Sequence, residues 1–293
     1  MLEGSLLHQL KTAHQPGQVG KRPLNFGVYY KNTLVSLCHA LEDFILECST
    51  PPLVIAAFQR GKWYLQEADR YADLAERSRQ IVIMATPDSG FTEHPTSQKA
   101  NVELVSLNSG DPVGQEWHLM ILGPTYAAMV LCQELSDADY VQQGVPTHDL
   151  ERKFYGFWTF ETNLVHETIE LAIVHIHQYD SALAENLTAQ VHQTMTHQAV
   201  VQDDLSGVVS RVIDYLQANQ LELDSDSMLR SGEYSPDQHH HLDSNLLSNE
   251  VQAFLRMAQL TDQADQTNST AAAEVAVLAE AMGQLLDLPV WQI

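Results

Sequence analysis

The chain has 293 residues, enough to bury a sizeable hydrophobic core in one large domain or two smaller ones. Its 38 Asp and Glu residues against 15 Lys and Arg give a formal net charge of −23, which opposes binding to nucleic-acid phosphates and to anionic lipid head groups. Neither nucleic acid nor membrane insertion is therefore expected, and no apolar run approaches the roughly 18 residues of a membrane span.

The cysteine pattern points to a reducing compartment. Cys38, Cys48 and Cys132 are an odd number of cysteines, without the CxxC spacing of a metal or redox site. Cys38 and Cys132 fall within apolar patterns, where packed, reduced thiols are usual. Because the first residues, MLEGSLLHQL, also lack the basic-then-apolar layout of a secretory signal, we expect a cytoplasmic protein.

Two helices are predicted before the first strand. A short helix is expected over residues 4–12, followed by a loop that contains Gly and Pro. Asn32 is then placed to cap a second helix, which Pro51 and Pro52 end. The apolar face of this helix is formed by Leu34, Leu37, Leu41, Ile45 and Cys48.

Residues 53–85 are predicted to form one βαβ unit: the segments LVIAAF, QRGK, WYLQEADRYADLAERS and RQIVIMA fit strand, turn, helix and strand. Both strands are continuously apolar, as in sheets that helices cover on both faces. Glu67 and Arg70 are spaced for an ion pair on the outer surface of the helix. The buried stripe of the helix is predicted to be Tyr64, Ala68, Tyr71 and Ala75.

Three more strand-like runs follow the polar segment at residues 86–100: VELVSLN, EWHLMILG and AAMVLCQEL. Gly123 and Pro124 separate the last two, which predicts an antiparallel hairpin and therefore a mixed sheet. A helix is expected from about Ser136. The aromatic run from Phe154 to Phe160 is too dense for a surface and predicts a further strand, before a helix over residues 161–179.

From Ala182 onward the apolar spacing is helical. The stripes are Leu183, Leu187, Val191 and Met195; Leu205, Val209, Val212 and Leu216; Leu247, Val251 and Phe254; and Val275, Leu278, Met282 and Leu285. Each covers two or three turns, so we expect a small bundle or packing against a partner subunit. Residues 224–244 are expected to be disordered. The predicted fold class is thus α/β (α+β), a mixed β-sheet flanked by helices over residues 1–200, followed by an acidic all-helical region over 201–293.

The turn after the strand at residues 53–58 is the best candidate for a contact surface. It lacks the GxGxxG and GxxxxGK[ST] patterns that bring backbone amides to phosphate. Arg60 and Lys62 lie at the start of a helix, where an anion would be favoured, and ordinary surface ion pairing is the alternative. For His118 the alternative is a satisfied core histidine. The candidate ligand- or partner-binding residues are Gln59, Arg60, Lys62, Trp63, Tyr64, Glu67, Trp117 and His118.

Two other patterns give little support to metal binding or catalysis. His166, Glu170 and His177 share a helix face, but Glu170 and His177 are roughly 10 Å apart along the helix axis, too far for one metal ion. Adjacent Cys38 and His39 point about 100° apart on a helix, which disfavours a nucleophile with its base. We therefore expect no catalytic residues, no bound metal and no cofactor.

Several stretches together resemble the DICT domain, a sensory module found alongside diguanylate cyclases and two-component proteins, especially in cyanobacteria. They are YYKNTLVSLCHALEDFIL (29–46), LVIAAFQRGKWYLQEADRYADLA (53–75), DPVGQEWHLMILGPTYAAMVLCQELS (111–136) and FYGFWTF (154–160), in the family's order and spacing over about the first 200 residues. The resemblance implies a cytoplasmic signal-input or protein-interaction role connected with light responses, and it implies no catalytic residues. No GGDEF, EAL, HD-GYP, kinase or helix-turn-helix motif follows the DICT-like part.

The first hypothesis is therefore a non-enzymatic signal-transduction or regulatory protein that acts through protein partners, such as two-component or other signalling proteins, with light or redox responses as the expected setting. A scaffold or assembly factor that senses nothing is the alternative. The third hypothesis is an enzyme that uses Arg60 and His118 with carboxylates such as Glu67 or Glu116. Homodimerisation is a further expectation, because the short apolar stripes need partners.

Overall fold

The computed structural model describes residues 2–15, 21, 24–87, 90–140, 146, 152–197, 207–208, 210–212 and 214–216. The chain divides into a compact unit at Met1–Val208 and a second unit at Val209–Ile293. The elements described below all belong to the first unit. The linker expected at residues 224–244 and the apolar stripes that begin at Leu247 and Val275 lie outside the described residues.

Within the described residues, seven strands form one sheet in the order β1-β7-β6-β5-β2-β3-β4. The strands are β1 (Gly27–Tyr30), β2 (Leu53–Phe58), β3 (Gln80–Ala85), β4 (Val102–Ser106), β5 (Glu116–Leu122), β6 (Ala127–Glu134) and β7 (Lys153–Thr159). β2, β3 and β4 run parallel to one another, whereas β2, β5, β6, β7 and β1 are joined by antiparallel pairing. The parallel pair of the βαβ unit, the β5–β6 hairpin and the mixed sheet are therefore confirmed.

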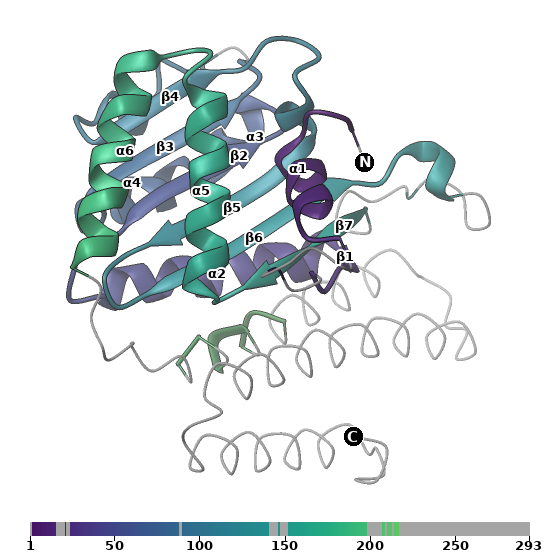
Figure 1. The fold of residues 1–293 in the computed structure, drawn as a ribbon, viewed down its shortest axis with the longest axis horizontal. Helices are drawn as coiled ribbons and strands as arrows, with labels where there is room; N and C mark the ends of the chain where they lie inside the picture. Colours follow the sequence, from purple (N-terminus) through teal and green to yellow (C-terminus); the bar gives the residue numbers. More distant parts are fainter. Residues whose placement is uncertain are drawn as a thin grey trace, which may run out of the picture. The chain divides into compact units, whose positions relative to one another are not determined.

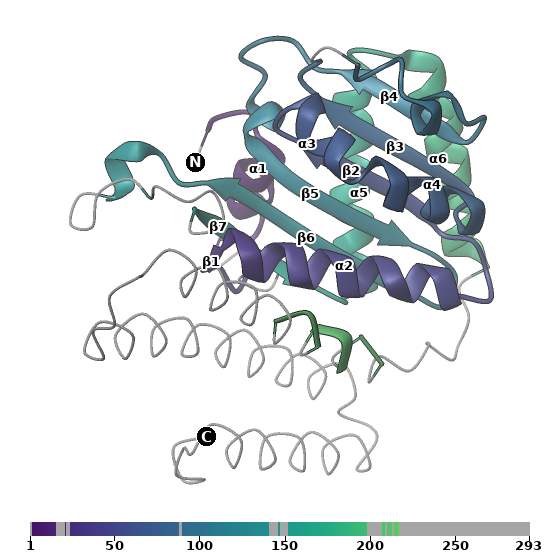
Figure 2. The same ribbon diagram turned by 180° about the vertical axis from the view of Figure 1, so that it is seen from behind.

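Helices cover both faces of this sheet. They are α1 (Leu6–Ala13), α2 (Lys31–Glu47), α3 (Gly61–Gln66), α4 (Ala68–Arg77), α5 (Thr162–Ile176) and α6 (Ser181–Thr196), with short 3-10 turns η1 (Pro95–Gln98), η2 (Pro112–Gln115) and η3 (Asp137–Tyr140). α1, α5 and α6 lie across one face (Figure 1), and α2, α3 and α4 lie on the other (Figure 2). Burial on both sides explains why β2 and β3 are apolar without alternation.

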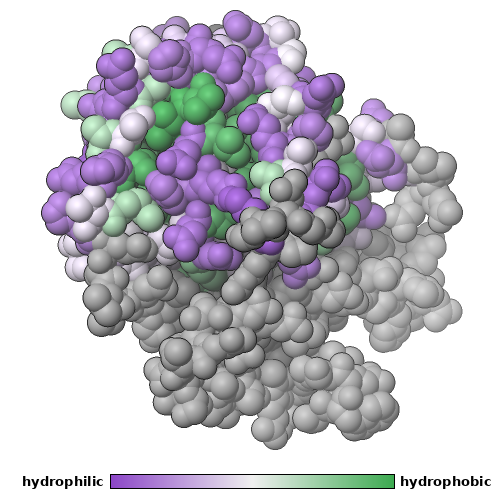
Figure 3. Space-filling view, in the orientation of Figure 1, coloured by the Kyte–Doolittle hydropathy of each residue, from purple (hydrophilic) through white to green (hydrophobic). Residues whose placement is uncertain are grey.

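The main hydrophobic core lies under α1, α5 and α6. Its members include Leu53, Ile55, Val82, Met84, Met120, Leu122, Met129 and Leu131 from the sheet and Leu6, Leu10, Val165, Ile169, Ala172, Leu183, Leu187 and Val191 from the helices. The outer surface on this side is mainly hydrophilic with small apolar patches (Figure 3), and Val174 of α5 is 65% exposed. The stripe of α6 was expected in a bundle or against a partner subunit. That expectation is wrong, because Leu183, Leu187 and Val191 pack in the core of the sheet.

The strand β1 stands where the sequence predicted only a loop, and it changes the start of α2. β1 pairs with β7, and the backbone N–H of Lys31 donates to the carbonyl of Arg152 at 2.8 Å, which extends this pairing. α2 begins at Lys31, so the predicted cap at Asn32 is wrong. Asn32 lies buried in the first turn, where its side-chain oxygen accepts a hydrogen bond from the Thr33 N–H. The sheet, rather than a capping side chain, sets the helix start.

Two further expectations concern the segment after β6. The aromatic run forms β7, in which Phe154, Phe157 and Trp158 are buried, as the sequence predicted. The helix expected from about Ser136 is a single 3-10 turn, η3, within the described residues. The side chain of Asp139 accepts hydrogen bonds from both the N–H and the hydroxyl of Ser136, which holds this turn.

Candidate functional site

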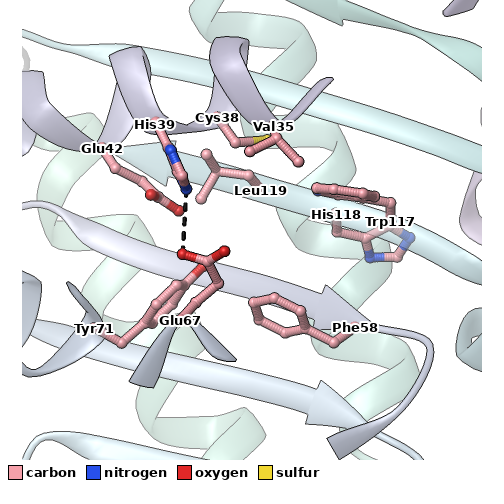
Figure 4. A pocket seen from close by; sticks show the side chains of 10 residues that line it. All are labelled: Val35, Cys38, His39, Glu42, Phe58, Glu67, Tyr71, Trp117, His118 and Leu119. Atoms are coloured by element: carbon pink, nitrogen blue, oxygen red, sulfur yellow. Dashed lines mark hydrogen bonds and ion pairs between the residues drawn. The ribbon is translucent and has the colours of Figure 1, made fainter. Parts of the chain in front are cut away.

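A pocket lies between α2 and α4, on the face of the sheet opposite α1 (Figure 4). Its cavity volume is about 30 Å³, which is room for about two water molecules. The lining residues are Val35, Cys38, His39 and Glu42 from α2, Glu67 and Tyr71 from the α3–α4 segment, and Phe58, Trp117, His118 and Leu119 from β2 and β5. Three of the eight candidate residues from the sequence, Glu67, Trp117 and His118, are among them.

A hydrogen bond between His39 and Glu67 joins α2 to the junction of α3 and α4 (Figure 4). The imidazole Nε2 and the carboxylate Oε2 are 3.2 Å apart, and the two side chains are 23% and 33% exposed. Deeper in the pocket, Glu42 is only 4% exposed and Leu119 only 1%. The hydrogen bond from His39 lowers the pKa of Glu67, although burial opposes this effect. The pair therefore forms the solvent-facing side of the pocket.

Arg70 of α4 holds two carboxylates of α2. Its Nε lies 2.5 Å from the Glu42 carboxylate and its Nη2 lies 2.6 Å from that of Asp43. The expected surface ion pair of Arg70 with Glu67 on one continuous helix is therefore wrong. The chain leaves helical geometry at Glu67, and α4 packs against α2 so that Arg70 faces the neighbouring helix. Burial raises the pKa of Glu42, and Arg70 partly offsets this rise.

The Cys38 thiol and the Tyr71 hydroxyl, also in the pocket lining, are protonated and enclosed. Burial raises the pKa of the Cys38 thiol and of the Tyr71 hydroxyl well above their ordinary values. Cys38 is 5% exposed, which confirms the packed thiol and leaves it without the thiolate that a nucleophile requires. The rings of Phe58 and Tyr71 meet edge to face with centroids 5.7 Å apart.

The residues of the turn after β2 do not form one surface. Tyr64 is fully buried, donates or accepts a hydrogen bond with Ser97 at 3.0 Å, and packs among aromatic rings in the core. Gln59 is 8% exposed, whereas Arg60 and Lys62 are exposed. Half-buried Trp63 lies beneath two ammonium groups, those of Lys31 and Lys62, at 5.1 and 5.5 Å from its ring centroid.

The imidazole of His118 belongs to a second polar cluster, on the α1 face of the sheet. Its Nε2 lies 3.0 Å from the carboxylate of Glu116, and both side chains are 0% exposed. Glu116 also accepts the backbone N–H groups of Leu6 and Leu7 at 3.0 and 2.9 Å, which ties the first turn of α1 to β5. Because side chains alternate along a strand, Trp117 and Leu119 face the pocket and the imidazole of His118 faces away from it.

The candidate residues from the sequence did not include His39, Glu42 or Tyr71. Val35, His39 and Glu42 recur at helical spacing on α2, beside the apolar face that the sequence analysis used. That second stripe is the signal that could have located the pocket. Its partner, Tyr71, was recognised only as part of the buried stripe of the next helix.

Two family models match the chain, and both are described as sensor domains. Residues 4–135 match the family model DICT, described as a sensory domain in diguanylate cyclases and two-component system. Residues 148–225 match CHASE6_C, described as the C-terminal domain of a two-partite extracellular sensor domain. The resemblance to the DICT domain is thereby confirmed over residues 4–135. No curated protein and no solved structure matches the chain.

The two matched segments contribute to the same sheet. The DICT match contains β1 to β6, and the second match contains β7, α5 and α6. β7 lies between β1 and β6 in the strand order, so it hydrogen-bonds to strands of the DICT match on both sides. A hydrogen-bonded sheet occupies one compartment, so both segments lie on the same side of any membrane. Among the described residues, no helix is long and apolar enough to cross a bilayer.

The hydrogen-bonded pair of His39 and Glu67 at the edge of the pocket gives a first prediction. Glu67→Gln is expected to lower the free energy of unfolding by about 0.5–1 kcal/mol at neutral pH, because the pair is partly exposed. The pKa of Glu67 is lower in the folded protein than its ordinary 4.5, so its stabilisation is present above that value and is lost as the pH falls through the folded pKa. Urea unfolding of both proteins at about pH 7 and about pH 3 measures the difference.

Glu76→Gln is the matched control for this measurement. Glu76 lies on α4, its side chain is 72% exposed, and its contact with Lys99 spans 3.6 Å. The free energy of unfolding of Glu76→Gln should stay close to that of the wild type at both pH values. If Glu67→Gln lowered the free energy of unfolding as much in acid as at neutral pH, the stabilisation could not be assigned to the ionised Glu67 carboxylate.

Proposed function

We propose that this chain, which carries a DICT sensory domain at residues 4–135, is a regulatory protein that detects a signal with its α/β unit and passes it to protein partners without catalysing a reaction. The observation that carries the proposal is that the two segments that match sensor families contribute strands to one hydrogen-bonded sheet. The pocket between α2 and α4 is the input site that we propose. The partners are two-component or other signalling proteins, or a larger assembly.

The chemistry of the pocket supports binding rather than catalysis. His39 is paired with Glu67, and Glu42 is paired with Arg70. The buried Cys38 thiol is protonated because burial raises its pKa. A covalent mechanism needs an activated nucleophile next to a base, and the pocket lining contains no such pair among the residues that the structure describes.

The setting that we propose is the cytoplasm. Cys38, Cys48 and Cys132 are free thiols, as is usual in a reducing compartment. Because both matched segments share one sheet, they belong in the same compartment. Direct oxidation of Cys38 or Cys132 is disfavoured as the stimulus, because burial raises the pKa of both thiols and oxidation requires an accessible thiolate. A light response is proposed from the resemblance to the DICT family.

Partner capture tests whether the C-terminal unit carries the surface that binds the signalling partner. We expect the full chain to capture a signalling partner from its host, and a chain that ends at Val208 to keep its thermal transition but lose that partner. If the shortened chain folds and retains every partner, the C-terminal unit is not the output surface. Sedimentation of the full chain, with a mass of 32.8 kDa, tests the expected homodimer in the same preparation.

A further inference from the structure

Three aromatic rings and two carboxylates meet in the α2–α4 pocket. The rings are those of Phe58, Tyr71 and Trp117, and the carboxylates are those of Glu42 and Glu67 (Figure 4). Proteins hold organic ammonium groups in this way, with the electron-rich faces of aromatic rings around the cation and a carboxylate beside it. The pocket therefore has the chemistry of a cation site rather than that of a phosphate site.

The charges around the pocket favour the same ligand. The acidic and basic side chains nearest the pocket are Lys31, His39, Glu42 and Asp43 on α2, and Glu67 and Arg70 on the α3–α4 segment. Three carboxylates thus face two fixed cations. The guanidinium of Arg70 already lies against Glu42 and Asp43, and the ammonium of Lys31 lies 5.1 Å from the ring centroid of Trp63. An anionic ligand would meet Glu42 and Glu67, which repel it.

The size of the cavity and the set of side chains that could act as ligands limit which cations the pocket can bind. The cavity of about 30 Å³, together with the space that the imidazole of His39 vacates when a ligand displaces it, admits one compact head group and excludes a large aromatic ligand. Divalent metal ions need several oxygen, nitrogen or sulfur ligands around one point. Among the described residues, no three His, Cys, Asp or Glu side chains are placed to hold a metal ion. A small organic ammonium group satisfies both limits.

We infer that the α2–α4 pocket binds the ammonium head group of a small organic molecule, with Glu67 as its carboxylate partner and Trp117 and Tyr71 as its aromatic walls. This inference rests on the proposed function, in which the pocket is the input site. The imidazole of His39 lies beside Glu67, with its Nε2 3.2 Å from the carboxylate. The ligand cation competes with His39 for that carboxylate, so binding loosens the link between α2 and the α3–α4 junction.

Calorimetric titration of the full chain with choline, and with its neutral isostere 3,3-dimethylbutan-1-ol, tests the inference. Choline is expected to bind with a Kd of about 1 mM or tighter, and the isostere about tenfold more weakly, because the isostere has the same shape but no charge. Equal affinities for the two compounds would overturn the inference, and so would the absence of binding by choline.

Two carboxylate variants make the test specific to the pocket. Glu67→Gln preserves the size of the side chain and should weaken choline binding about tenfold. Glu76→Gln, with its exposed side chain on the same segment, should leave the Kd of choline unchanged. Thermal unfolding of both variants verifies that they are folded. If the wild type and Glu67→Gln bound choline with equal affinity, Glu67 would not be part of the binding site, and the inference would be contradicted.

Partner capture separates failure of this inference from failure of the proposed function. If choline does not bind but the shortened chain still loses its partner, the proposed output role stands and the ligand class is wrong. If choline binds through Glu67 but capture by the full chain is the same with and without choline, the ligand site stands and the pocket does not control the output.

Discussion

Replacing Glu116 with alanine is expected to destabilise the protein by about 3–5 kcal/mol. The carboxylate is fully buried and accepts three hydrogen bonds, from the N–H groups of Leu6 and Leu7 and from Nε2 of His118. Its removal leaves two backbone donors at the start of α1 and one imidazole nitrogen without an acceptor inside the protein. α1 should consequently detach from β5, and Leu6, Leu7 and Leu10 should lose their place in the core.

Denaturant unfolding measures this loss, and hydrogen exchange of the Leu6 and Leu7 amides reports the release of α1. Glu116→Gln keeps one acceptor oxygen and should lose less stability than Glu116→Ala. The matched control is Glu103→Ala, because Glu103 is an exposed carboxylate on β4. A stability of Glu116→Ala within about 1 kcal/mol of the wild type would show that water or another group replaces the carboxylate.

Gly156→Ala is expected to cost about 3 kcal/mol or more, because β7 has no room for a methyl group at this position. A Cβ atom on Gly156 would lie 2.2 Å from the carbonyl oxygen of Leu131 and 2.5 Å from Cα of Cys132. Both are backbone atoms of the paired strand β6, which cannot rotate away as a side chain can. The strands must separate there, which weakens the pairing of β7 with β6 and with β1.

Thermal unfolding measures the effect, since each kcal/mol lowers Tm by about 2–4 °C in a domain of 150–250 residues. Gly114→Ala is the control, because its new Cβ would approach only the hydroxyl of Thr86, at 3.2 Å, and the side chain of Leu107. That variant should unfold within a few degrees of the wild type. Equal transitions for Gly156→Ala and the wild type would contradict the close packing of β6 on β7.

The part of the fold that short-range patterns determine could be predicted from the sequence. Continuous apolar runs located β2 and β3, and Gly123 with Pro124 located the hairpin of β5 and β6. β1 was missed because it has only four residues, and its partner β7 lies far along the chain. The start of α2 was misplaced for the same reason, because pairing with β7 precedes the helix.

The candidate site was predicted less completely, because it depends on contacts between distant elements. Glu67 was identified, but its expected helix partner Arg70 instead binds Glu42 and Asp43 of α2. The spacing of residues along one helix cannot show which neighbouring helix it meets. His118 was identified for its polarity within an apolar strand, and strand alternation then directs its side chain to Glu116 rather than to the pocket.

The insertion of β7 between β1 and β6 has a consequence for biosynthesis. β1 lies at the edge of the described sheet and leaves the ribosome early, whereas its partner β7 follows only after β2 to β6 have been translated. α1 likewise emerges first and must wait for Glu116 before its first turn is anchored. Non-local contacts of this kind form late in folding. The N-terminal segment can therefore take its final place only after β5 with Glu116 and then β7 have been translated.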